Sequence, residues 1–342
     1  MLSEEIIDVT GRGAVILGLD VVCDGFHFGP KARVQSHVHQ DHMNEFETSK
    51  GLQKIIMSPQ TYDLIVLEKN ADIPYRANIK VLKNSDTMKV GDCEVKLIGS
   101  GHMLGAVQVQ VSLPDGTKLG YSGDFSWPIG DTIKVDALVV DCTCGGFTKC
   151  RNYTQDDANS RLVELVSGML KNGPVVMKAH RGTLQRALDV LDHEIETQVV
   201  CTPGTCKETK VYQRYGYSVP QLYAVDSPEG KQIMDNGKYI LVVRSGERNL
   251  PTSTEIPTII LSAYIGSPNE PVLEYNEKCF RVALTGHADF NDTLSYIQAT
   301  GAQLVVTDNT RGGHAVELAL EIESALGICA RPSSNRIGRG WD

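Results

Sequence analysis

The segment spanning residues 36–42 most constrains what this chain can fold into. It reads Ser-His-Val-His-Gln-Asp-His, and its metal-binding side chains are His37, His39, Asp41 and His42. Alternate residues of an extended segment point the same way, so the first two histidines can share one ion while a following turn directs the other pair to a second position. Imidazole and carboxylate groups suit zinc, and paired ions form hydrolytic centres. A solvated loop is the simpler alternative, but this spacing in a chain with nine histidines favours a metal site.

Two further candidate ligands flank a predicted β-hairpin. His102 lies in a glycine-rich segment before a strand with strict alternation, and Asp124 follows the return strand. Paired strands bring their ends together, so the two side chains can lie side by side. Alone, His102 is equally well explained as a buried core histidine and Asp124 as a turn residue. Beside the 36–42 segment, we interpret both as metal ligands, with Asp124 placed between two ions.

The composition is that of a globular protein with about two domains. The chain has 342 residues, of which 41% are hydrophobic and 22% charged. No apolar run approaches the roughly 20 residues that cross a bilayer, and residues 1–13 do not resemble a secretion signal. We therefore expect a cytoplasmic protein that does not bind a membrane. Nine cysteines without a CxxC pair predict free thiols, and the net charge of −9 requires any surface that binds a polyanion to be local.

The middle of the chain predicts an inserted α/β layer. A strand that ends in Asp141 is followed by a helix whose start, Thr154 to Asp157, has the pattern of a capping box. Strands and helices then alternate as far as about residue 270. We expect the core of the first domain to resume with the strand 280–284.

These motifs together resemble those of the metallo-β-lactamase superfamily. The resemblance is carried by the segments 36–42, 101–106 and 122–124. Asp141, the Gly-His-Ala-Asp segment around His287, and the Gly-His pair that ends at His314 are similar to the additional motifs of the β-CASP branch, whose members are nucleases. The layout is most similar to short bacterial and archaeal β-CASP exonucleases, some of them linked to DNA ligase operons.

The resemblance implies an α/β fold of a particular kind. This is an αββα sandwich formed by residues 1–146 and 271–342, with a β-CASP domain inserted at 147–270. It implies two Zn²⁺ ions, which the same ligands could replace with Mn²⁺. The implied ligands are His37, His39 and His102 for one ion, Asp41, His42 and His314 for the other, and Asp124 between them.

The resemblance also implies catalytic roles. Asp41 belongs to the catalytic centre, His287 is the general acid that protonates the leaving oxygen, and Asp141 orients the ring of His287. As single residues, three of these positions have simpler explanations. His314 could be a histidine at a helix start, His287 a structural histidine, and Asp141 a cap at a strand end.

Two basic stretches are candidates for binding nucleic acid. Lys178, Arg181 and Arg186 surround the turn into a predicted helix, and helix N-termini bind phosphate. Arg336 and Arg339 belong to a basic and aromatic C-terminal tail, which suits phosphate charge and base stacking. A solvated surface is the alternative for both stretches.

The sequence therefore favours a dinuclear zinc nuclease that hydrolyses phosphodiester bonds of single-stranded nucleic acid. A histidine in the last motif is typical of RNA-acting β-CASP members, which slightly favours RNA processing or decay over a DNA exonuclease in repair. A small-molecule hydrolase, such as a lactonase or thioesterase, would suit the acidic net charge. The complete ligand set argues against a catalytically silent binding subunit. The sequence leaves a homo-oligomer open.

Overall fold

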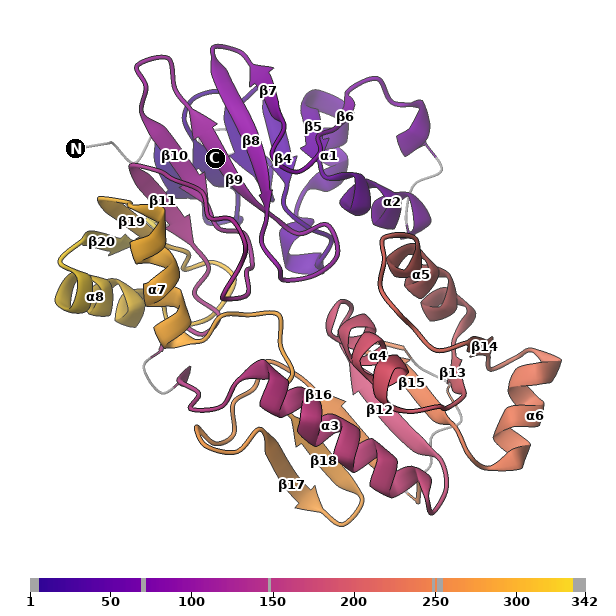
Figure 1. The fold of residues 1–342 in the computed structure, drawn as a ribbon. Coiled ribbons are helices and arrows are strands. Elements are labelled where there is room, and N and C mark those ends of the chain that lie inside the picture. The colour runs from indigo at the N-terminus through magenta and orange to yellow at the C-terminus, as the bar shows by residue number, and fades with distance from the viewer. Residues whose placement is uncertain (1–5, 69–71, 147–148, 248–249, 251–254, 335–342) are drawn as a thin grey trace. The chain divides into compact units, whose positions relative to one another are not determined.

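The chain forms two compact units with mixed α/β structure. The computed structural model describes residues 6–68, 72–146, 149–247, 250 and 255–334. The first unit comprises residues 1–150 and 287–342, and the second comprises residues 151–286 (Figure 1). Three multi-stranded sheets are present, two in the first unit and one in the second. Among the described residues, no helix combines the length and apolar character that a membrane span requires.

The first unit contains two sheets. The first sheet has the order β1-β2-β3-β4-β5-β6 and consists of β1 (Ile7–Val9), β2 (Val15–Leu17), β3 (Val21–Cys23), β4 (Ala32–Gln35), β5 (Lys54–Met57) and β6 (Ile79–Val81). The second has the order β20-β19-β11-β10-β9-β8-β7 and consists of β7 (Thr87–Val90), β8 (Cys93–Gly99), β9 (Val107–Ser112), β10 (Lys118–Tyr121), β11 (Ala137–Val140), β19 (Leu304–Thr307) and β20 (Cys329–Pro332).

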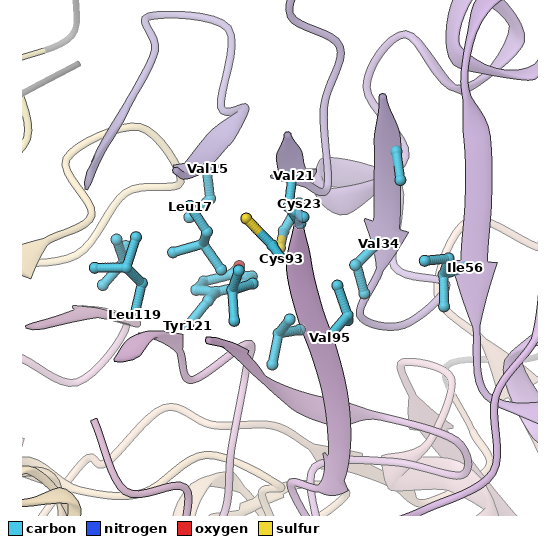
Figure 2. Packing of buried hydrophobic residues seen from close by; sticks show 14 of the residues in the cluster. Val15, Leu17, Val21, Cys23, Val34, Ile56, Cys93, Val95, Leu119 and Tyr121 are labelled. Atoms are coloured by element: carbon cyan, nitrogen blue, oxygen red, sulfur yellow. The ribbon is translucent and has the colours of Figure 1, made fainter. Parts of the chain in front are cut away.

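One apolar core joins the two sheets. Val34 and Ile56 of the first sheet and Val95 and Tyr121 of the second are buried in the same cluster (Figure 2). These residues follow the alternation of a strand with one face against a core, which explains why their neighbours can be polar. Burial of this apolar area is the main term that stabilises the unit.

Helices cover the outer side of the second sheet. Leu138 and Val140 of β11 are buried with Ile297 of α7 (Phe290–Thr300) and Leu318 of α8 (Ala315–Leu326). On the first sheet, α1 (Phe46–Leu52) contacts β5. The remaining helical elements of the unit are α2 (Pro59–Glu68) and the 3₁₀ turns η1 (Gln40–His42) and η2 (Ile73–Tyr75).

The second unit is built on one largely parallel sheet of order β14-β13-β15-β12-β16-β18-β17, in which only the β17–β18 pairing is antiparallel. Its strands are β12 (Val175–Ala179), β13 (Val199–Cys201), β14 (Leu222–Ala224), β15 (Ile240–Arg244), β16 (Thr258–Leu261), β17 (Val272–Asn276) and β18 (Cys279–Val282). Its helices are α3 (Gln155–Leu170), α4 (Thr183–Glu194), α5 (Pro203–Arg214) and α6 (Pro228–Asn236). The predicted capping box is confirmed, because Thr154 and Asp157 exchange hydrogen bonds at the start of α3.

Two expectations from the sequence are wrong. The strand predicted at 280–284 does not belong to the core of the first domain, because β18 pairs with β16 in the sheet of the second unit. The second unit therefore extends to residue 286 and not only to residue 270. The cysteines are not all free thiols either, since Cys201 and Cys206 form a disulfide. The turn from β13 into α5 brings their Cα atoms to 6.2 Å from each other.

Candidate metal centre

The predicted metal ligands of the first unit lie at the C-terminal ends of strands. The 36–42 segment follows β4, Asp124 follows β10, Asp141 follows β11, and His102 lies in the loop after β8. In the second sheet, β8 and β10 are both antiparallel to β9, and β11 is parallel to β10. All three of these strands therefore end at the same edge of the sheet.

Gly123 allows the chain to turn sharply into Asp124. Its φ of +54° lies in the left-handed region, which favours glycine. A Cβ atom at this position would lie 2.7 Å from the carbonyl oxygen of Val107. The close approach of these two segments thus requires the absence of a side chain, and it brings the carboxylate of Asp124 to the histidines.

Four side chains converge on one point. The Nε2 atom of His37 lies 3.1 Å from the Nδ1 atom of His39, which in turn lies 3.1 Å from the Nε2 atom of His102. The Oδ2 atom of Asp124 lies 3.5 Å from both of those Nε2 atoms. One ligand atom from each of the four residues lies within 4.8 Å of the others. Three imidazoles and a carboxylate are a donor set that suits zinc.

His42 forms the second part of the site. Its Nε2 atom is buried and has no hydrogen-bond partner among the residues that the structure describes. The nearest acceptor atoms are Oδ1 of Asp124 at 3.2 Å and Oδ2 of Asp41 at 3.6 Å. The side chain of Asp41 is 57% exposed, so it borders solvent. Of the four ligands that the resemblance implies for a second ion, three therefore face one another here.

Asp24 supports this arrangement, although the Asp-Gly pair at 24–25 is typical of an ordinary turn. It is fully buried, its Oδ2 atom accepts a hydrogen bond from Nδ1 of His42 at 2.8 Å, and the same carboxylate accepts from Ser36 Oγ. That hydroxyl also lies 2.9 Å from Nδ1 of His37. A carboxylate behind an imidazole fixes the tautomer and the ring orientation of a metal ligand.

The electrostatics of the site favour a bound cation. Burial by itself would raise the pKa of Asp124, but His42 and His37 lower it well below its ordinary value. Burial would lower the pKa of His42, but Asp124 and Asp24 raise it to about 10. Burial lowers the pKa of His37 to about 3, so its ring is uncharged at neutral pH and has one nitrogen without a proton. The buried carboxylates therefore stabilise positive charge at this position.

Asp141 and His287 lie beside the group formed by His37, His39, His102 and Asp124, which we call the four-ligand group. The Oδ2 atom of Asp141 lies 3.2 Å from Nδ1 of His287, while its Oδ1 atom accepts hydrogen bonds from the backbone and hydroxyl of Thr143. The Nε2 atom of His287 lies 3.9 Å from Oδ2 of Asp124. Burial would lower the pKa of His287, but the hydrogen bond to Asp141 and the charge of Asp124 raise it above its ordinary value. The two carboxylates thus favour the protonated form of His287, whose Nε2 atom faces Asp124.

His314 is a predicted ligand that the structure does not bring to the other candidates. Among the described residues, the groups able to hold a metal include neither His314 nor Asp41, although Oδ2 of Asp41 lies 3.6 Å from Nε2 of His42. His314 is the residue before α8, and its Nδ1 atom lies 3.1 Å from a carboxylate oxygen of Glu317 in the first turn. Its backbone amide donates to the carbonyl of Cys142. The imidazole of His314 pairs with a carboxylate in the first turn of the helix. This position is the one described by the alternative in which His314 is a histidine at a helix start.

The predicted nucleic-acid contacts require correction. Arg181 is buried, and its guanidinium forms two hydrogen bonds, of 2.9 and 3.0 Å, with the carboxylate of Glu208, so the prediction of an exposed phosphate contact is wrong. Arg186 donates to the carbonyl oxygen of Thr285 at 3.0 Å. Lys178 is half-buried on β12. Arg336 and Arg339 lie outside the described residues.

Comparison with known proteins places the chain in a family. A scan against models of protein families finds no match. Over 130 residues, which are 37% of this chain and 92% of the relative, it is 32% identical to a protein from Acidianus ambivalens named "Uncharacterized protein in lig 3'region". The chain belongs to the family of this Acidianus protein.

Two further similarities are more distant. Over 338 residues, this chain is 22% identical to a "Probable DNA ligase" from Opitutus terrae, a match that covers 91% of the chain and 31% of that protein. The chain thus spans less than a third of the length of this relative. A crystal structure of a protein of unknown function from Enterococcus faecalis V583 has a similar fold, with a TM-score of 0.57 at 16% identity over 81% of this chain and 74% of the other.

Replacement of Asp24 with asparagine should weaken zinc binding by about 10- to 100-fold. Asp24 accepts at Oδ2 from Ser36 Oγ and His42 and at Oδ1 from the Ser36 amide and Gln35, and an amide has only one accepting oxygen, so these hydrogen bonds cannot all be retained. Competition titration against a zinc-binding dye would measure the change. Asp20→Asn is the matched control, because this carboxylate pairs with Lys31 and should leave the affinity unchanged. Wild-type affinity in a folded Asp24→Asn protein would show that Asp24 does not support the site.

Proposed function

We propose that this chain is a metal-dependent nuclease of the β-CASP branch of the metallo-β-lactamase superfamily, which hydrolyses phosphodiester bonds of single-stranded nucleic acid. The observation that carries the proposal is the convergence of His37, His39, His102 and Asp124 beside the Asp141–His287 pair. In this proposal the two-sheet unit is the αββα sandwich, and the second unit is the β-CASP insertion. The similar fold of the Enterococcus protein is compatible with this but does not bear on activity.

The residues present fit the metal ions that such an enzyme requires. Among the described residues, the buried Nε2 atom of His42 has no hydrogen-bond partner, an arrangement that costs free energy unless the atom has a ligand. His37, His39, His102 and Asp124 would hold one ion, and His42 and Asp41 would contribute to holding a second. Zinc fits these nitrogen and oxygen donors best, and manganese is the alternative. When bound, such ions neutralise phosphate charge and activate water.

In this proposal, His287 transfers the proton and Asp141 orients its ring. In the proposed reaction, Nε2 of His287 donates a proton to the oxygen that leaves phosphorus. Asp141 keeps the opposite nitrogen, Nδ1, hydrogen-bonded, which directs the donor nitrogen toward the ligands. The raised pKa of His287 favours the protonated ring, which is the form that a general acid requires. Thr143 holds the second oxygen of Asp141 and so fixes its orientation.

We propose DNA rather than RNA as the substrate. The preference for RNA rested on His314, which pairs with Glu317 away from the four-ligand group. Two relatives have names that refer to DNA ligase or to its gene region. A nuclease that trims single-stranded ends before ligation would suit that context. A DNA-repair role therefore replaces RNA processing as the favoured assignment.

One experiment tests the proposal against its alternatives. Purified protein is incubated with end-labelled single-stranded DNA and RNA of the same sequence, with Zn²⁺ or Mn²⁺, and with EDTA as a control. We expect cleavage of DNA that EDTA abolishes and that is faster than cleavage of RNA. Faster cleavage of RNA would restore the RNA assignment. Absence of EDTA-sensitive cleavage of both polymers would end the nuclease proposal, and turnover of a lactone or thioester would then support the small-molecule hydrolase.

A further inference from the structure

We propose that the second unit binds the bases of the single DNA strand on a surface formed by Tyr264, Tyr275 and Arg281, which we call the tyrosine–arginine surface. This inference rests on the proposed function, because it names where the substrate strand is held. All three residues belong to the second unit. These three residues are separate in sequence from the predicted basic turn around Arg181, although Lys178 of that turn lies on the same face of the sheet as Arg281.

The two tyrosine rings share one guanidinium group. The Cζ atom of Arg281 lies 4.9 Å from the ring centroid of Tyr264 and 5.4 Å from that of Tyr275. Both tyrosines remain about half exposed, at 48% and 49%. The Nε atom of Arg281 is buried and has no hydrogen-bond partner. Cation–π contacts with both rings thus hold the side chain of Arg281 in place. The rings themselves remain partly exposed to solvent.

The surface lies on one face of the sheet. Arg281 of β18 is in register with Ile260 of β16, and Ile260 is in register with Lys178 of β12. Residues in register point to the same face, so Lys178 and Arg281 share one face. The next residue of β18, Val282, is buried in the core formed with α3 and α4, which places Arg281 on the opposite face. β17, which carries Tyr275, is the edge strand of the sheet and lies next to β18 (Figure 1).

The chemistry of this face fits single-stranded nucleic acid. The chain as a whole is acidic, with a net charge of −9, so a polyanion needs a local pair of cations such as Lys178 and Arg281. Exposed tyrosine rings offer stacking platforms that accept any base, and an arginine beside them adds cation–π attraction. In duplex DNA the bases are already stacked on one another, so this surface would favour a single strand.

The test is binding of a fluorescein-labelled oligothymidylate of about 20 nucleotides, a length that exceeds the typical single-strand site of one binding module. Fluorescence anisotropy is measured with EDTA present, so that cleavage does not interfere. We expect Tyr264→Ala and Tyr275→Ala each to weaken binding by about 10-fold, within the range that loss of one stacking ring produces. Tyr264→Phe should bind as the wild type does. Tyr215→Ala, which removes another partly exposed tyrosine of this unit, is the matched control and should have no effect.

A charge variant provides an independent measurement. Lys178→Gln should lower the slope of log affinity against log salt concentration by about 0.7, the value for one phosphate contact on a single strand. A purely structural role of Lys178 would leave that slope unchanged. Wild-type binding by both alanine variants, or no binding of the oligonucleotide by the wild-type protein, would overturn the tyrosine–arginine surface.

The surface and the proposed nuclease activity can fail separately. With metal restored, hydrolysis of bis(4-nitrophenyl) phosphate reports the catalytic centre alone, because this small diester does not need an extended binding surface. The tyrosine variants should keep this activity and lose affinity only for the oligonucleotide. If the wild type hydrolyses neither substrate but the variants still bind the oligonucleotide more weakly, the nuclease proposal fails and the binding surface stands.

Discussion

Replacement of His287 with alanine should lower kcat for phosphodiester hydrolysis by about 10²- to 10⁴-fold and leave the metal content unchanged. The reason is that the proposed proton donor and the candidate metal ligands are different residues. The imidazole of His287 is hydrogen-bonded to Asp141 through Nδ1, and it lies beside the four-ligand group without belonging to it. Its removal takes away the proton donor and leaves His37, His39 and His102 in place. Metal analysis of the purified variant, together with kcat on a small diester, measures both parts.

The control for this variant is His180→Ala. His180 is an exposed histidine of the second unit, and its loss should alter neither kcat nor metal content. A His287→Ala protein that loses its metal would identify His287 as a ligand instead of a proton donor. A variant that keeps both metal and full kcat would remove His287 from the mechanism altogether.

Replacement of His39 with alanine should abolish both zinc binding at the four-ligand group and nuclease activity. The Nδ1 atom of His39 lies 3.1 Å from the nearest nitrogen of His37 and of His102, so it is the donor that links the two. Without it, three donors remain for an ion that prefers four. Isothermal titration with zinc measures the change, and activity measured at saturating zinc shows whether added metal can compensate.

Gln40→Ala is the matched control for the loss of His39. Gln40 is the exposed neighbour in the same segment, and its side chain has no place in the predicted ligand set. We expect this variant to bind zinc and to cleave DNA as the wild type does. Undiminished zinc affinity in a folded His39→Ala protein would contradict the proposed coordination.

The convergence of the first candidate ligands, His37, His39 and His42, was predictable from the sequence because their spacing is local. The alternation of His37 and His39 and the short turn to His42 are properties of a few consecutive residues. Asp24 was not predictable in the same way. Its role depends on a hydrogen bond to His42, which lies 18 positions later, and the Asp-Gly pair at 24–25 has the composition of an ordinary turn.

Two of the departures from the predictions arise from long-range pairing, and the one at His314 arises from a local ion pair. Arg181 has the composition of a phosphate contact, but the fold places Glu208 of α5 beside it, and a buried guanidinium needs such a partner. The strand β18 has the apolar pattern of a core strand of either unit, and its pairing with β16 decides which sheet it joins. The imidazole of His314 lies within reach of Glu317 one helical turn later, and this ion pair is independent of the motif that suggested a metal ligand.

The most direct test of the account is an anomalous-scattering map from crystals of the zinc-loaded protein. We predict a zinc peak about 2.0–2.2 Å from His37 Nε2, His39 Nδ1 and His102 Nε2, with a carboxylate oxygen of Asp124 as the fourth ligand. A zinc ion bound elsewhere, with these four side chains free of metal at stoichiometric zinc, would contradict the account.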